Sequence, residues 1–162
     1  MVEQQEVVKK RLRLVDMTFS SEEVYKTIRK ESDSLHYFFI EKEHELKPSK
    51  YGHERKFVFS MIRPIDNFAR TEMLIELNFE NLNKVKQNGK EIDKGDVTLT
   101  ITSNVYLDYR NEWWMSKFNR KLFKFYLKYF VKEKIKKLYL KTLTEETEKI
   151  YNIIKEKLEY YH

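Results

Sequence analysis

His44 and His53 are the residues whose side-chain types come closest to a metal site, and they lie on either side of a predicted turn at Pro48. If the flanking segments pair as a hairpin, the two histidines could face each other, with Glu45 and Glu54 nearby. Two histidines and a carboxylate are ligand types for zinc or iron. Their spacing matches no established metal motif, so the sequence favours two histidines at strand ends, and we predict no metal site.

Other combinations of residues that perform catalysis are missing from the sequence. The chain has no cysteine, which excludes disulfides, thiol nucleophiles and Cys-ligated zinc. It has 3 glycines, none of them in a phosphate-binding loop, and neither paired carboxylates nor a Ser, His and Asp frame stand out. We therefore predict a protein that binds its partner without catalysing a reaction and without a cofactor.

Polar residues interrupt the apolar side of several predicted strands. In a cavity between a sheet and a C-terminal helix, such groups would orient a hydrophobic ligand that carries one polar or anionic end. The alternative is that the lysines reach the sheet edge and that the serine bonds its own backbone. The candidate residues are Lys10, Lys42, His44 and Ser103.

Positive charge is concentrated in residues 113–141. The chain carries 32 Lys and Arg against 26 Asp and Glu, a net charge of +6, and this segment alone holds 10 of the bases and 1 of the acids. The remainder has 32 − 10 = 22 bases and 26 − 1 = 25 acids, a charge of −3. A local basic surface of this kind indicates an anionic partner.

Within this segment, residues 117–132 have the pattern of an amphipathic helix. At 100° per residue the aromatic and aliphatic side chains gather on one arc, which we predict to be core. The opposite arc is entirely basic, and the range contains no acid that would support it by ion pairs one turn away. These predicted anion-binding residues are Lys117, Arg120, Lys121, Lys124, Lys128 and Lys132.

Three kinds of partner would bind a helix with this pattern. The first is RNA or a ribonucleoprotein such as the ribosome, bound through phosphates, with Trp113, Trp114 and Tyr126 available to stack on bases. The second is an anionic membrane surface. The third is a homodimer in which the helix meets an acidic row of another copy, made of Glu41, Glu43 and Glu45.

The elements that would position these residues can be read from periodicity. Alternation predicts strands over residues 6–15, 37–47, 54–62, 68–80 and 97–109. Ser20 and Glu23 have the spacing of a capping box and predict a short helix to about Lys30. Asn88-Gly89 predicts a hairpin turn. A last helix either runs from about residue 134 or restarts near residues 142–144.

One side of each later strand is more apolar than the other, which indicates antiparallel strands with one face in contact with solvent. The predicted inward residues are Phe38, Ile40 and Leu46, then Phe57, Phe59 and Met61, then Thr71, Met73, Ile75, Leu77 and Phe79, and finally Val97, Leu99, Ile101, Val105 and Leu107.

We therefore predict an α+β fold, in which a curved antiparallel sheet of five to six strands packs on a long C-terminal helix. A short helix follows strand 1, and the basic helix precedes the last one. This order resembles the helix-grip fold of the START-like, SRPBCC superfamily, which implies a carrier or sensor of a hydrophobic small molecule between sheet and C-terminal helix. The runs NLNKVKQNGKEIDKGDVTLTITSNVYLDY, EWW and FNRKLFKFY are similar to an uncharacterised archaeal protein group, which implies a fold and no catalytic residues.

At 162 residues the chain has the length of one domain, with strands and short helix in residues 1–111 and C-terminal helices in residues 112–162. Residues 1–14 lack the apolar centre of a signal peptide, so we expect a cytoplasmic protein.

Overall fold

The computed structural model describes residues 3–65, 69–107, 117–126 and 140–161. These residues form five strands and three helices. In chain order they are β1 (Glu3–Phe19), α1 (Ser21–Ser34), β2 (Phe38–Ser49), β3 (Gly52–Pro64), β4 (Ala69–Gln87), β5 (Lys90–Leu107), α2 (Lys117–Tyr126) and α4 (Lys141–Glu159).

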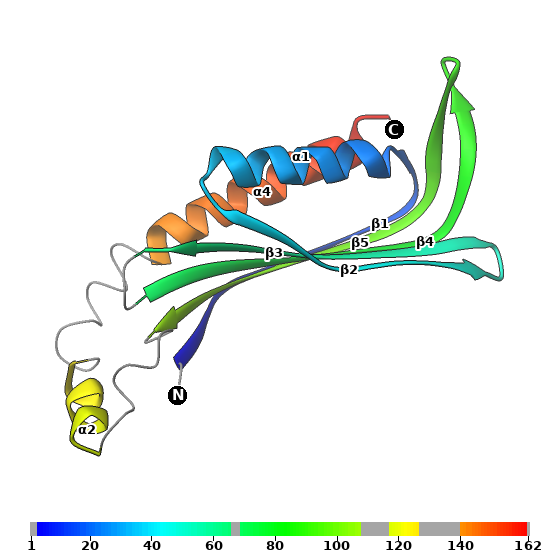
Figure 1. Ribbon diagram of the computed structural model, residues 1–162. Coiled ribbons are helices and arrows are strands. Elements are labelled where there is room, and N and C mark those ends of the chain that lie inside the picture. The colour runs from blue at the N-terminus through cyan, green and yellow to red at the C-terminus, as the bar shows by residue number, and fades with distance from the viewer. Residues whose placement is uncertain (1–2, 66–68, 108–116, 127–139, 162) are drawn as a thin grey trace.

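The five strands form one antiparallel sheet in the order β1-β5-β4-β3-β2 (Figure 1). β4 and β5 are longer than the alternation predicts, because both continue to the turn at Asn88 and Gly89. Both turn residues have positive φ angles, 51° and 77°, as a type I′ turn requires, and Gln87 pairs with Lys90 across it. The predicted hairpin turn is therefore confirmed.

Bulges bend the sheet near this hairpin. The register shifts between Leu14 and Met17 on β1, and between Glu80 and Asn83 on β4. Asp16 and Asn81, which lie within these two shifts, have φ angles of 54° and 55°. The Asp96 carboxylate joins them, because it accepts hydrogen bonds from the Asp16 amide at 2.8 Å and from Asn81 Nδ2 at 3.2 Å.

Between the two bulges, Gly95 makes room for the bend. A Cβ atom at this residue would lie 2.7 Å from the carbonyl oxygen of Glu80, which is closer than side chains tolerate. The far end of the β4 and β5 hairpin consequently rises from the plane of the sheet toward the side that carries the helices (Figure 1).

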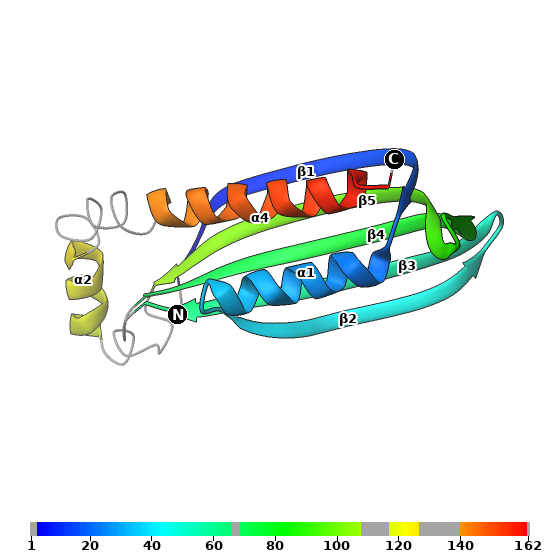
Figure 2. The same ribbon diagram turned by 90° about the horizontal axis from the view of Figure 1, so that it is seen from above.

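α1 and α4 lie side by side on one face of the sheet (Figure 2). Ser20 is the N-cap of α1 and accepts a hydrogen bond from the Glu23 amide at 3.3 Å, as the capping box predicts. The Glu23 carboxylate does not return this bond but accepts the hydroxyl of Tyr161 instead. The final helix thus shares the sheet with α1, the short helix predicted after strand 1.

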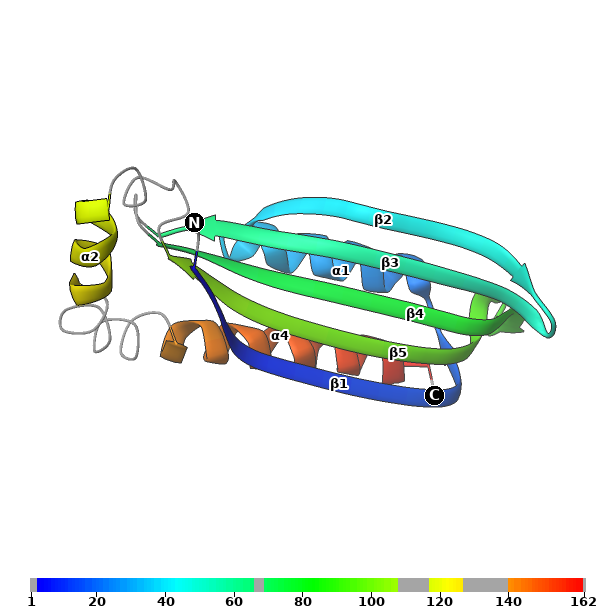
Figure 3. The same ribbon diagram turned by 90° about the horizontal axis from the view of Figure 1, so that it is seen from below.

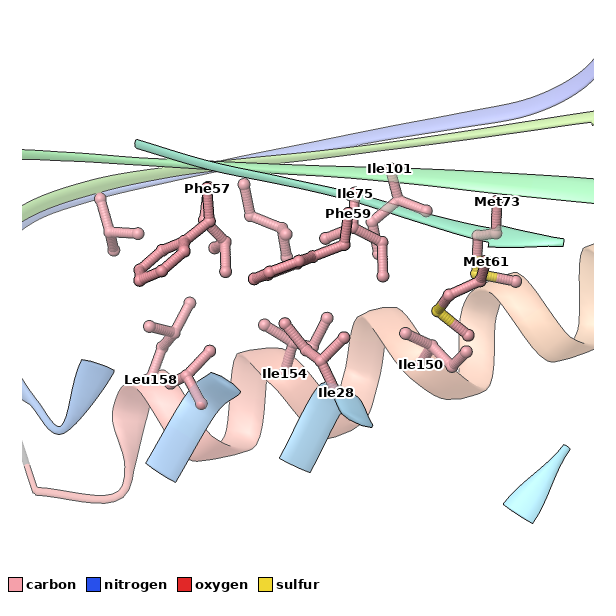
Figure 4. Packing of buried hydrophobic residues seen from close by; sticks show 14 of the residues in the cluster. Ile28, Phe57, Phe59, Met61, Met73, Ile75, Ile101, Ile150, Ile154 and Leu158 are labelled. Carbon is pink, nitrogen blue, oxygen red and sulfur yellow. The ribbon is translucent and has the colours of Figure 1, made fainter. Parts of the chain in front are cut away.

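The core is a single cluster between the sheet and these two helices (Figure 4). Ile150, Ile154 and Leu158 of α4 and Ile28 of α1 point toward the sheet, and each is at most 1% exposed. The predicted inward residues of β3, β4 and β5 are all buried. The α+β class and the curved sheet on a C-terminal helix are therefore confirmed.

The predicted face of β2 is wrong for Phe38 and Ile40. Phe38 and Ile40 are 67% and 45% exposed and lie on the outer face, while Phe39 packs at 5.1 Å from Phe59 in the core. Because residues 37–40 are all apolar, alternation in this part of the strand does not show which face is buried. A bulge between Glu41 and Glu43 then exchanges the two faces of the strand. Leu46 pairs with Arg55 and is on the helix-bearing face, as predicted, but its parity does not extend to Phe38 and Ile40 before the bulge.

The outer face of the sheet has none of the described helices against it (Figure 3). α4 is described from Lys141, and Leu140 already has helical backbone angles of −69° and −47°. The choice between a continuous and a restarted last helix rests on residues 127–139, which lie outside the described part of the chain.

Candidate functional site

α2 stands at one end of the sheet, apart from the layer that α1 and α4 form (Figures 1 and 2). Four of the six predicted anion-binding residues are on it, and all four are exposed: Lys117, Arg120, Lys121 and Lys124. Lys128 and Lys132 lie outside the described residues, as do Trp113 and Trp114. Tyr126 is the last residue of α2, and its side chain also lies outside the description.

The apolar side of α2 is not core, which corrects the prediction for the residues described. Phe118 is 71% exposed, Phe125 is 56% exposed and Leu122 is 41% exposed. The cause is that α1 and α4 already cover the apolar face of the sheet, so this helix has no place in that core. α2 therefore presents a basic arc and an apolar arc to its surroundings at the same time.

The four polar residues predicted to line a cavity beside the C-terminal helix do not come together. Lys10 reaches the sheet edge, where its Nζ lies 3.3 Å from Glu148. Lys42 is exposed in the β2 bulge. The Ser103 hydroxyl is buried 2.6 Å from that of Thr147, which in turn donates to the carbonyl of Leu143 at 2.6 Å. On this side of the core, Ile150, Ile154 and Leu158 of α4 point toward the sheet (Figure 4).

The two histidines do not face each other. His44 is paired with Phe57 and His53 with Pro48, which separates them by four residues, roughly 13 Å along the strands. Among the described residues there is no group of three or more His, Asp or Glu side chains that could hold a metal ion.

The acidic row predicted on β2 is also divided by the bulge. Glu41 is on the helix-bearing face, where its carboxylate accepts a hydrogen bond from the Tyr25 hydroxyl at 3.2 Å. Glu43 is on the outer face, 3.5 Å from Lys56 Nζ. The three glutamates thus present no continuous acidic surface to a second copy.

A pocket that the sequence did not predict lies at the N-terminal end of α1. Its volume is about 430 Å³, within the range of small-molecule sites. The first turn of α1, the paired strands β2 and β3, and the raised hairpin of β4 and β5 contribute its walls. The lining residues are Ser20, Ser21, Glu22, Tyr25, Glu41, His44, Arg55, Phe57, Lys84, Glu91, Ile92 and Asp93.

Arg55 occupies one wall of this pocket. Its guanidinium lies over the Phe57 ring at 4.7 Å, donates from Nε to His44 Nε2 at 3.2 Å, and donates from Nη1 to the Ser21 hydroxyl at 3.2 Å. His44 is itself stacked on Phe57, with ring centroids 4.5 Å apart. Within the described part of the chain, half-buried Arg55 forms no ion pair with a carboxylate.

Asp93 holds the N-terminus of α1 against β5. One carboxylate oxygen accepts from the Ser21 amide at 3.0 Å and from its hydroxyl at 2.7 Å, and the other lies 2.7 Å from Lys84 Nζ. Burial opposes ionisation of Asp93, but the hydrogen bonds from Lys84 and Ser21 outweigh it and hold the pKa below its usual value. The charges of Asp93 and Lys84 are therefore satisfied by each other.

Among the pocket residues, sequence reasoning named only His44 as a candidate to line a ligand cavity, while Glu41 was expected in an acidic surface for a second copy. Most of the other lining residues come from α1, β3, β4 and β5, and no spacing along the chain relates Ser21, Arg55 and Asp93. The one signal in the sequence was the capping box at Ser20, which locates the start of α1 but not the strands that meet it.

No model of a known protein family matches the chain, and a search of curated proteins finds no match either. The predicted START-like relationship stays a prediction. None of the helices described here is both long enough and apolar enough to pass through a membrane.

Proposed function

We propose that this protein binds an anionic membrane surface through α2, lying on the bilayer without crossing it. The observation that carries the proposal is the exposure of Phe118, Leu122 and Phe125 beside a basic arc that contains no acid. An amphipathic helix of this composition lies in the plane of the interface, with its apolar side between headgroups and acyl chains.

Electrostatics supports the same partner. Lys117, Arg120, Lys121 and Lys124 are all exposed on one arc, where the like charges of the three lysines repel one another. Anionic headgroups relieve this repulsion, and each Lys or Arg near such a surface contributes on the order of 1 kcal/mol. Binding by these four residues should therefore weaken as salt concentration rises.

The sequence alone placed RNA first, and the exposure of the apolar arc reverses that order. A helix that tracks phosphates places its cations and its stacking rings toward the same nucleic acid. In α2 the two classes lie on separate arcs, and Leu122 has no ring to stack on a base. Separate basic and apolar arcs are what a membrane interface selects.

Vesicle co-sedimentation tests the proposal. The full chain is mixed with vesicles of phosphatidylcholine alone, or of phosphatidylcholine with phosphatidylglycerol, at low and high salt. We expect pelleting only with the anionic vesicles, reduced at high salt. Changing Lys117, Arg120, Lys121 and Lys124 to Gln, or Phe118, Leu122 and Phe125 to Ser, should each reduce pelleting at least tenfold.

A matched control changes four other exposed lysines to Gln and so lowers the net charge equally: Lys30, Lys86, Lys90 and Lys149. This variant should pellet like the wild type. If it loses as much binding as the α2 variant, the effect belongs to net charge and the proposal is wrong. Absence of pelleting, together with salt-dependent binding of a labelled single-stranded RNA that needs the α2 lysines, would replace the membrane with RNA.

A further inference from the structure

The pocket at the N-terminal end of α1 holds a charged group, Arg55, that forms no ion pair with a carboxylate among the residues the structure describes. Arg55 uses Nε and Nη1 on the neutral acceptors His44 and Ser21, and no described residue accepts a hydrogen bond from Nη2. A half-buried guanidinium whose plane is fixed by an aromatic ring is a receptor for a carboxylate, because its planar fork matches both carboxylate oxygens. From this geometry we propose that the pocket binds a small zwitterion that carries a ring, of the amino-acid type.

The carboxylates of the pocket argue against a simple anion. Glu22, Glu41, Glu91 and Asp93 all line it, and a phosphate or a second free carboxylate would meet their repulsion. Asp93 is matched by Lys84, and Glu22 lies 2.9 Å from Lys26. Glu41 and Glu91 have no ion pair with a Lys or Arg side chain among the residues described. Their carboxylates would accept hydrogen bonds from the ammonium group of the ligand.

The aromatic side chains of the pocket indicate the chemistry of the uncharged part of the ligand. Tyr25, His44 and Phe57 line the pocket, and His44 keeps a large part of its surface open to solvent. Their rings offer a stacking wall for a ring of the ligand. Only Tyr25, Phe57 and Ile92 are apolar among the lining residues, so a long acyl chain would have little to contact.

Three probes, each with one phenyl ring, test the contributions of the carboxylate and the ammonium group separately. Phenylalanine carries both charges, 3-phenylpropionate carries only the carboxylate, and phenethylamine carries only the ammonium. In isothermal titration calorimetry with the full chain, we expect phenylalanine to bind and each of the others to bind at least tenfold more weakly. If no probe binds at millimolar concentration, or if either single-charge probe binds as well as phenylalanine, the inference is overturned.

Two variants assign the binding to the pocket. Arg55→Lys keeps the charge but loses the planar fork, and should weaken phenylalanine binding at least tenfold. Glu91→Gln changes an exposed side chain, so it should weaken binding several-fold without altering the unfolding midpoint. Arg11→Lys on the outer face of β1 is the matched control and should bind like the wild type. If Arg55→Lys fails to fold, undiminished binding to Glu91→Gln still overturns the inference.

These experiments are independent of vesicle binding, because none of the described side chains of α2 lines the pocket. Loss of pelleting in the α2 variants should leave phenylalanine binding unchanged, so either proposal can fail without the other.

Discussion

Arg63 on β3 donates from Nη2 to both carboxylate oxygens of Glu146 on α4, at 2.9 Å each. The same guanidinium donates from Nη1 to the carbonyl of Leu35 at the end of α1, at 2.8 Å. Tyr37 adds a 2.6 Å hydrogen bond from its hydroxyl to Glu146. These four residues join the sheet and both helices that cover it at a single point.

Glu146→Gln should be among the more destabilising polar substitutions in the chain. It removes a charge from a largely buried pair and leaves Arg63 without its counterion, which costs about 2–3 kcal/mol for a pair that retains some solvent contact. Urea unfolding followed by circular dichroism measures this loss. Glu148→Gln, two residues on, breaks the exposed pair with Lys10 and should cost less than about 1 kcal/mol. Equal losses in the two variants would contradict the structural role of Glu146.

Tyr37 should make the protein sensitive to alkaline pH. Burial, followed by the hydrogen bond to Glu146, raises the pKa of the Tyr37 hydroxyl well above its ordinary value of about 10. The unfolded chain therefore loses this proton first, so the stability from neutral Tyr37 is full below about pH 10 and is lost as pH rises further. The advantage of the wild type over Tyr37→Phe in free energy of unfolding should shrink above that pH. A difference that stays constant from neutral to alkaline pH would show that the hydroxyl does not titrate differently in the fold.

Asp93 should make the stability of the protein sensitive to acid pH. Its pKa is lowered in the fold, because hydrogen bonds from Lys84 and Ser21 outweigh the effect of burial. The folded state thus binds the proton less readily than the unfolded chain, so the stability is present above about pH 4 and is lost as pH falls below it. Unfolding of wild type and Asp93→Asn across this range should give curves that converge toward low pH. Curves that run parallel would contradict the prediction.

Phe38 and Phe39 provide a matched pair that tests the face assignment of β2. Phe39 contacts the rings of Tyr25 and Phe59, so Phe39→Ala should cost about 2–3 kcal/mol, while Phe38→Ala on the exposed face should stay within about 0.5 kcal/mol. Thermal unfolding of the two variants measures the difference. The reverse order would return β2 to the orientation that its sequence predicted.

The sequence by itself determined the strands whose two faces differ clearly, the hairpin turn and the start of α1. In β4 and β5 apolar residues recur at every second position over several repeats, so burial of one face determines which side of each strand points to the core. Asn88-Gly89 determines the position of the hairpin turn, because few residue pairs adopt two positive φ angles. Ser20 determines the start of α1, because its hydroxyl accepts a hydrogen bond from a free backbone amide of the first turn.

Only the tertiary structure decided the orientation of β2, the exposure of α2 and the existence of the pocket. A bulge at Glu41 exchanges the faces of β2, and nothing in the local pattern marks it. Phe118 and Phe125 have the periodicity of core residues, yet α1 and α4 already cover the apolar face of the sheet. Arg55 meets the Ser21 hydroxyl only where β3 lies against the first turn of α1, because the surroundings of Arg55 come from residues far apart in the chain.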